Sequence, residues 1–122
     1  MLKKGYIFLA IFILYSCNED IVIYVESVDR VSTSQFSIRL NRKVSSFYPK
    51  NIYVRRGALT GSNVPFTLST GCDDQFDFYM NFDPPLKDGV TYYVIFHEGT
   101  FQKIVNDIWI DSKSSVFEVH NY

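Results

Sequence analysis

The chain has 122 residues, of which 47% are hydrophobic and 20% are charged, and its formal net charge is −1. This is the length of one domain and the composition of a folded protein, which excludes a disordered chain. The near-neutral charge excludes the basic surface that nucleic-acid binding requires. Aromatic residues make up 17% of the chain, and Phe and Tyr favour the half-buried surface of a β-sheet.

Residues 1–16 have the pattern of an export signal. Lys3 and Lys4 precede an almost unbroken apolar run over residues 5–15. This run is too short to span a bilayer, which takes about 20 helical residues. A buried core helix is the alternative, but the run has no polar face and no later segment offers a helical partner. We therefore expect a signal peptide that the mature protein lacks.

The segment Leu14-Tyr15-Ser16-Cys17 resembles the lipobox of bacterial lipoproteins, although Tyr15 is bulkier than the residue usual at its position. The resemblance implies cleavage before Cys17 and a lipid on its sulfur, so that the protein is held on a membrane. Residues 18–20, Asn-Glu-Asp, are similar to the acidic export signal of surface lipoproteins in the Bacteroides group. Together these features imply a lipidated tether over residues 17–20 at the outer membrane, with the cell surface and the periplasmic face as the two open locations.

The lipobox resemblance also determines what we expect of the two cysteines. Because the lipid occupies Cys17, Cys72 has no cysteine partner and is expected to be a free thiol. A disulfide between Cys17 and Cys72 is the alternative in an oxidising compartment.

From residue 21 onward, apolar and polar residues alternate with the period of strands that bury one face. The apolar stripes are Ile21/Ile23/Val25, Phe36/Ile38/Leu40, Ile52/Val54, Phe76/Phe78/Met80/Phe82 and Phe117/Val119. Residues 90–96 are apolar or aromatic on both faces, which predicts a central strand covered by the core and by a loop. Turn residues separate the runs at the short spacing of an all-β domain. Because Pro65 lacks an N–H, residues 64–68 fit a strand only at a sheet edge.

Residues 82–94, Phe-Asp-Pro-Pro-Leu-Lys-Asp-Gly-Val-Thr-Tyr-Tyr-Val, resemble the most recognisable stretch of bacterial Ig-like domains. Leu86, Gly89 and Tyr92 match the Leu-x-x-Gly-x-x-Tyr-x-Val pattern of that family. Residues 36–44 and 51–54 are similar to two of its other strands, whereas residues 102–106 keep only the Asn of its usual Asp, Gly and Asn. The resemblance implies an Ig-like antiparallel β-sandwich of about seven strands over residues 21–122, of the surface-layer and fibronectin III-like kind. It also implies that the Tyr92 hydroxyl bonds backbone a few residues upstream.

Few residues are candidates for a catalytic or a metal site. His97 and His120 lie in no motif of a nucleophile triad or a zinc site, and we expect solvent contacts at strand ends. The densest acidic group consists of Asp73, Asp74, Asp77 and Asp83. Carboxylates suit calcium, but the spacing is not that of an EF-hand and residues 71–74 fit a hairpin turn, so a site at Asp73–Asp77 stays open. We expect no cofactor, no metal and no catalysis.

Exposed aromatic residues are the feature best suited to binding. The candidates at outward or loop positions are Tyr48, Tyr53, Tyr79, Tyr93 and Trp109. Flat rings stack on sugars and anchor protein contacts. The alternatives are cross-strand pairing for the tyrosines and packing of a loop on the outer face of residues 90–96 for Trp109. Residues 57–63 and 98–109 are the loops expected to carry function.

Two classes of function remain. The first is a non-catalytic envelope lipoprotein whose Ig-like domain binds a glycan or another envelope protein. The alternative is a small inhibitor or immunity-type lipoprotein that blocks a specific protein partner. Exposed aromatic residues in a shallow groove would favour a glycan, whereas a large flat apolar patch would favour a protein.

Overall fold

The structure is a computed structural model that describes residues 21–71 and 76–122. The predicted signal peptide, the tether with Cys17, and residues 72–75 lie outside this range, so the predictions for them stay open. The described elements are β1 (Val25–Ser32), β2 (Gln35–Leu40), β3 (Ser46–Phe47), the 3-10 turn η1 (Pro49–Asn51), β4 (Ile52–Arg56), β5 (Thr67–Thr70), β6 (Asp77–Asn81), β7 (Thr91–Phe96), β8 (Phe101–Val105), β9 (Ile108–Asp111) and β10 (Ser115–His120). Within this range, no helix has the length and apolar character to cross a membrane.

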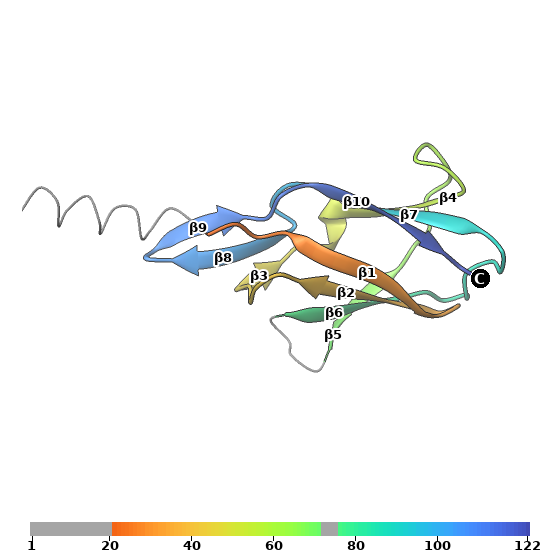
Figure 1. Cartoon of the computed structure of the whole chain (residues 1–122), viewed down its shortest axis with the longest axis horizontal. Coiled ribbons are helices and arrows are strands. Elements are labelled where there is room, and N and C mark those ends of the chain that lie inside the picture. Colours follow the sequence, from red (N-terminus) through yellow and green to blue (C-terminus); the bar gives the residue numbers. More distant parts are fainter. Residues whose placement is uncertain (1–20, 72–75) are drawn as a thin grey trace, which may run out of the picture.

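Two antiparallel sheets form the sandwich that the sequence predicts (Figure 1). One sheet has the strand order β1-β2-β6-β5 and the other has the order β10-β7-β4. This division into four and three strands is that of the Ig constant-type fold. A third sheet, β3-β8-β9, extends one end of the sandwich and was not predicted.

The apolar stripes meet between the two sheets and form the core. Its least exposed strand residues are Phe36, Ile38, Leu40, Val54, Phe78, Met80, Tyr92, Val94, Phe96 and Phe101. β7 is the middle strand of its sheet, which confirms the central position predicted for residues 90–96. Phe76 does not belong to the core as predicted: it is half-buried in the turn before β6, where the Arg39 guanidinium lies 5.0 Å from its ring centre.

The tyrosine corner is present. The hydroxyl of Tyr92 accepts a hydrogen bond of 2.8 Å from the backbone N–H of Lys87. Asn121, which sequence reasoning missed, is fully buried and donates from Nδ2 to the carbonyl of the same Lys87 at 2.8 Å. Its Oδ1 accepts from Nε of Arg30 at 2.8 Å. The turn before β7 is therefore held through both the N–H and the carbonyl of Lys87.

β1 begins later and runs further than the predicted strand. Ile23 is fully buried but precedes the strand. A register shift between Val25 and Ser27 lets Val25 and Val28, which lie three positions apart, both point inward. This bulge breaks the alternation on which the prediction depends.

Residues 98–109 are not the loop that the sequence suggested, because β8 and β9 pair there as a hairpin. The two turn residues, Asn106 and Asp107, have φ values of 52° and 63°. Positive φ at both central positions is typical of a type I′ turn, and Asn and Asp tolerate this conformation. At its base the hairpin joins the fold through Phe101, which is fully buried and pairs with Phe47 of β3.

Candidate functional site

The four main candidate residues for binding fall on three surfaces. Tyr53 on β4 and Tyr93 on β7 share the outer face of the β10-β7-β4 sheet. Tyr79 on β6 lies on the outer face of the other sheet. Trp109 belongs to the β3-β8-β9 sheet and is 52% exposed, so the alternative in which it covers the outer face of residues 90–96 is wrong. The structure thus brings two of the four together.

The outer face of the β10-β7-β4 sheet carries aromatic, apolar and charged side chains in register. Two neighbouring cross-strand rows are Val116–Ile95–Tyr53 and Glu118–Tyr93–Arg55. His97 packs edge-on against Tyr53, with 5.2 Å between the ring centres, and the guanidinium of Arg55 lies 5.7 Å from the Tyr53 ring centre. These two contacts hold the Tyr53 ring in place, which lowers the entropy that a ligand would have to remove on binding.

An open hollow of about 420 Å³ lies beside Tyr53, where the chain passes from one sheet to the other. Its lining residues are Pro49, Lys50, Ile52, Tyr53, Val54, Asn63, Val64, Pro65 and Phe66. Val64 donates its backbone N–H to the carbonyl of Val54 at 2.9 Å, which fixes this side of the hollow. β5 begins at Thr67, two residues after Pro65, so the proline lies outside the strand, and β5 is an edge strand. The volume lies within the roughly 300–1,000 Å³ of small-molecule sites.

A second hollow, of about 250 Å³, lies beside Tyr79 and is more polar. Its polar lining comes from Ser27, Asp29, Ser37, Arg39 and Asp77. Asp77 begins β6 and Asp83 follows its far end, so these two carboxylates are roughly 20 Å apart along an extended strand and do not converge. Over residues 21–71 and 76–122 no group of three His, Cys, Asp or Glu residues could hold a metal ion. Asp73 and Asp74 lie outside those ranges, and a calcium site there stays a prediction.

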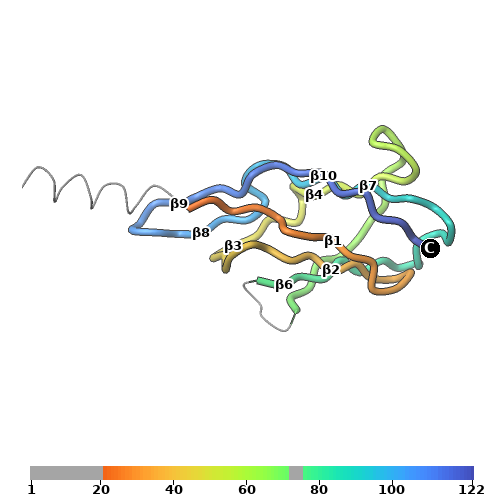
Figure 2. The backbone as a smooth tube through the Cα atoms, viewed as in Figure 1, coloured from red at the N-terminus to blue at the C-terminus, as the bar shows by residue number. Residues whose placement is uncertain are grey.

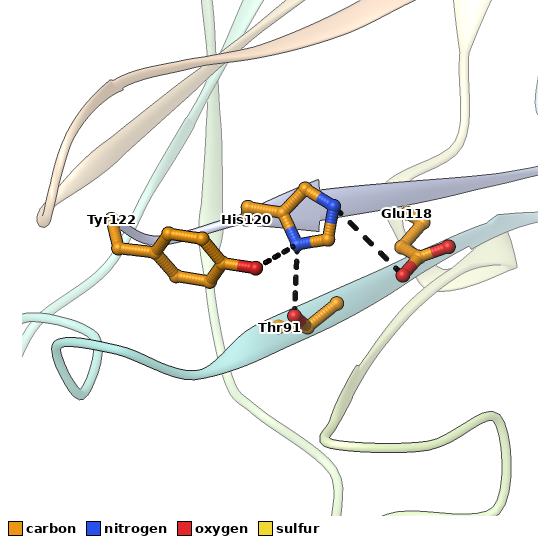
Figure 3. A network of polar contacts seen from close by, with 4 residues as sticks. All are labelled: Thr91, Glu118, His120 and Tyr122. Carbon is orange, nitrogen blue, oxygen red and sulfur yellow. Dashed lines mark hydrogen bonds and ion pairs between the residues drawn. The ribbon is translucent and has the colours of Figure 1, made fainter.

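A polar network that sequence reasoning missed surrounds His120 (Figure 3). The Thr91 hydroxyl lies 2.9 Å from Nδ1 of His120, and the Tyr122 hydroxyl lies 2.9 Å from the same atom. The Glu118 carboxylate is 3.9 Å from Nε2. The network arises from strand register, since Thr91 lies opposite His120, and this pairing of β7 with β10 cannot be read from local sequence.

This order of hydroxyl, imidazole and carboxylate resembles a catalytic triad, but its geometry does not fit one. Two hydroxyls compete for one ring nitrogen, and the carboxylate lies beyond hydrogen-bond length. The His120 and Glu118 side chains are 50% and 54% exposed. A triad requires an oriented base and a site that excludes water, whereas this network stands on an open sheet face.

The sequence matches no family model, and no curated protein is similar to it. Solved structures of a bacterial S-layer protein have the same fold. The N-terminal part of the S-layer protein SbsC matches with a TM-score of 0.66 and 18% identity, over 83% of this chain and 24% of that one. A structure of SbsC domains 1–6 matches with a TM-score of 0.67 and 17% identity, over 82% of this chain and 14% of that one. The likeness is one of fold.

Proposed function

We propose that this protein is a non-catalytic binding module of the cell envelope, tethered through lipid on Cys17. The observation that carries the proposal is the open hollow of about 420 Å³ beside Tyr53. Most of its lining is apolar or aromatic, and Lys50 and Asn63 add polar groups at its rim. A mainly apolar hollow with a few polar groups is the usual form of a ligand site.

The envelope location is supported by two independent features. The segment Leu14-Tyr15-Ser16-Cys17 resembles a lipobox, the motif that directs export and lipid attachment in bacterial lipoproteins. The fold is that of domains in an S-layer protein, and S-layer proteins are proteins of the bacterial surface. Because this chain spans 24% and 14% of those two chains, the comparison supports a shared domain and says nothing of a shared assembly.

A glycan is the ligand that the hollow favours. Tyr53 offers a ring held by Arg55 and His97, and a fixed flat ring at the edge of an open groove suits the apolar face of a sugar. The amide of Asn63 and the ammonium of Lys50 can bond sugar hydroxyls, since both side chains carry donors.

A protein partner is the second candidate. It would be another envelope protein, or the target that an inhibitor or immunity-type lipoprotein blocks. It is favoured by the row Val116–Ile95–Tyr53 on the neighbouring sheet face, where Val116 is 53% exposed. A flat row of this kind offers apolar contact area without a cleft.

A glycan array and a pull-down from envelope extract, each run with the wild type and three single variants, separate these proposals. We expect the wild type to bind glycans, Tyr53→Ala to lose that binding, and Tyr79→Ala on the opposite sheet to keep it. Capture of one envelope protein that Val116→Asp abolishes and Tyr53→Ala weakens would favour the second candidate. Robust turnover in a hydrolase screen would contradict both, because each describes binding without catalysis.

A further inference from the structure

The β8–β9 hairpin has a two-residue turn and a buried base. Ile104 lies opposite Trp109 and Val105 lies opposite Ile108, next to the two-residue turn. At the base, the Phe101 N–H donates to the Oγ of Ser112 at 3.0 Å, and both residues are buried. The hairpin is therefore a paired projection whose base is anchored in the fold.

The tip of this hairpin is apolar on both faces. Ile104 and Trp109 share one face and are 43% and 52% exposed, and Ile108 on the other face is 65% exposed. Large apolar side chains are ordinary on a surface when single, but a cluster of them marks a surface that contacts another phase or molecule. Because this cluster lies at the end of a projecting hairpin, only a surface outside the domain can bury it.

The N-terminal end of the described chain lies at the same end of the domain as the hairpin. Figures 1 and 2 show the first described residues beside β9 and the C-terminus at the opposite end. The Lys113 N–H, just after β9, donates to the carbonyl of Ile23 at 2.8 Å, which joins the two segments at the base of the hairpin.

The reach of the chain between Cys17 and Ile23 is sufficient to bring the hairpin tip to the membrane. From Ile23 back to Cys17 the chain extends at most roughly 20 Å. From Asp111 at the hairpin base to Ile108 at the tip, β9 extends roughly 10 Å. A bilayer that holds a lipid on Cys17 is therefore within reach of the tip.

The chemistry of the tip suits the headgroup region of a bilayer. Tryptophan prefers the headgroup region because its ring is apolar and its indole N–H is polar. Ile104 and Ile108 add apolar area, and the exposed Lys113 follows β9 further back, where lipid phosphates can meet its ammonium group. Asp107 in the turn limits insertion to a shallow depth, because burying a carboxylate in hydrocarbon is costly.

We propose that the β8–β9 hairpin docks on the bilayer that anchors Cys17, with Trp109 at the headgroup level. The inference rests on the proposed lipid anchor. Docking at a second point fixes the orientation of the domain, where a tether alone would leave it free to rotate. The connection after β4 and the C-terminus then face away from the membrane.

Trp109 makes this testable because it is the only tryptophan in the 122 residues, so fluorescence reports on the hairpin alone. The protein purified from the membrane fraction is reconstituted in vesicles of phosphatidylethanolamine and phosphatidylglycerol, with plain or brominated acyl chains. Docking predicts a blue-shifted emission in plain vesicles and loss of intensity in brominated ones. In Trp109→Phe/Tyr122→Trp the probe moves to the opposite end of the domain, and its emission should be the same in both vesicles.

Flotation of the vesicles separates this inference from the anchor on which it rests. Protein that floats with the vesicles but whose Trp109 is not quenched by bromine overturns docking and leaves the anchor standing. Protein that fails to float overturns the anchor and docking together. In a folded Ile104→Ser/Ile108→Ser variant quenching should fall, and full quenching there would overturn docking through the apolar tip.

Discussion

The hydroxyl of Tyr92 is one atom whose removal tests the fold. Tyr92→Phe keeps the buried ring and removes only the acceptor that lies 2.8 Å from the backbone nitrogen of Lys87. Stranding a buried donor costs about 1–3 kcal/mol. Because this hydrogen bond is only partly buried, water replaces some of it, and we expect the free energy of unfolding to fall by about 1–2 kcal/mol. Each kcal/mol corresponds to about 4–8 °C in Tm for a domain of this size.

The matched control is Tyr93→Phe, one residue along β7 and on the opposite, half-buried face. It should change the free energy of unfolding by less than about 0.5 kcal/mol. Urea denaturation followed by far-UV circular dichroism measures both variants. A double variant with Asn121→Ala should deviate from the sum of the single effects by about 0.5 kcal/mol or more, because both side chains hold Lys87. Equal denaturation midpoints for Tyr92→Phe and Tyr93→Phe would refute the reasoning.

Three further predictions concern the core, the buried amide and the second cysteine. Phe78→Ala should lower the free energy of unfolding by about 3–5 kcal/mol, because it leaves a cavity beneath β6. The control Val116→Ala, at an exposed position, should lower it by less than about 0.5 kcal/mol. Similar denaturation midpoints for the two variants would contradict the assigned faces. Asn121→Ala should cost about 1–3 kcal/mol by the same denaturation assay, since the carbonyl of Lys87 loses its donor, and an unchanged midpoint would argue against that contact. Thiol labelling of the denatured, unreduced mature protein should modify Cys72, whereas protection that only a reductant removes would indicate a disulfide.

Alternation and turn chemistry were sufficient to predict the central elements of the fold. β2, β6 and β7 were predicted because each carries an unbroken period of two or a recognisable turn before it. β1 was misplaced because a bulge between Val25 and Ser27 changes which residues face inward. The sequence predicts a loop where β8 and β9 form a hairpin, because the exposed face of the hairpin carries Ile104 and Trp109 and no polar stripe marks its outer side.

The candidate site was less accessible to prediction, because it depends on which strands become neighbours. The outward direction of Tyr53 and Tyr93 follows from their own strands, but their shared face depends on the pairing of β4 with β7. The hollow beside Tyr53 forms only because the chain after β4 folds back along that strand. Asn121 gave no local signal, since its side chain contacts Arg30 and Lys87, which are 91 and 34 residues away.

The mass of the intact protein from the membrane fraction tests the central claim most directly, because the envelope role and the docking of the hairpin both depend on Cys17. We predict a mature chain that lacks residues 1–16 and carries a thioether-linked lipid on Cys17. In Cys17→Ser we expect unprocessed or soluble material, because a lipid with several acyl chains is what gives stable anchoring. A wild-type protein that retains residues 1–16, or a Cys17→Ser variant that is cleaved normally and stays in the membrane, would contradict the account.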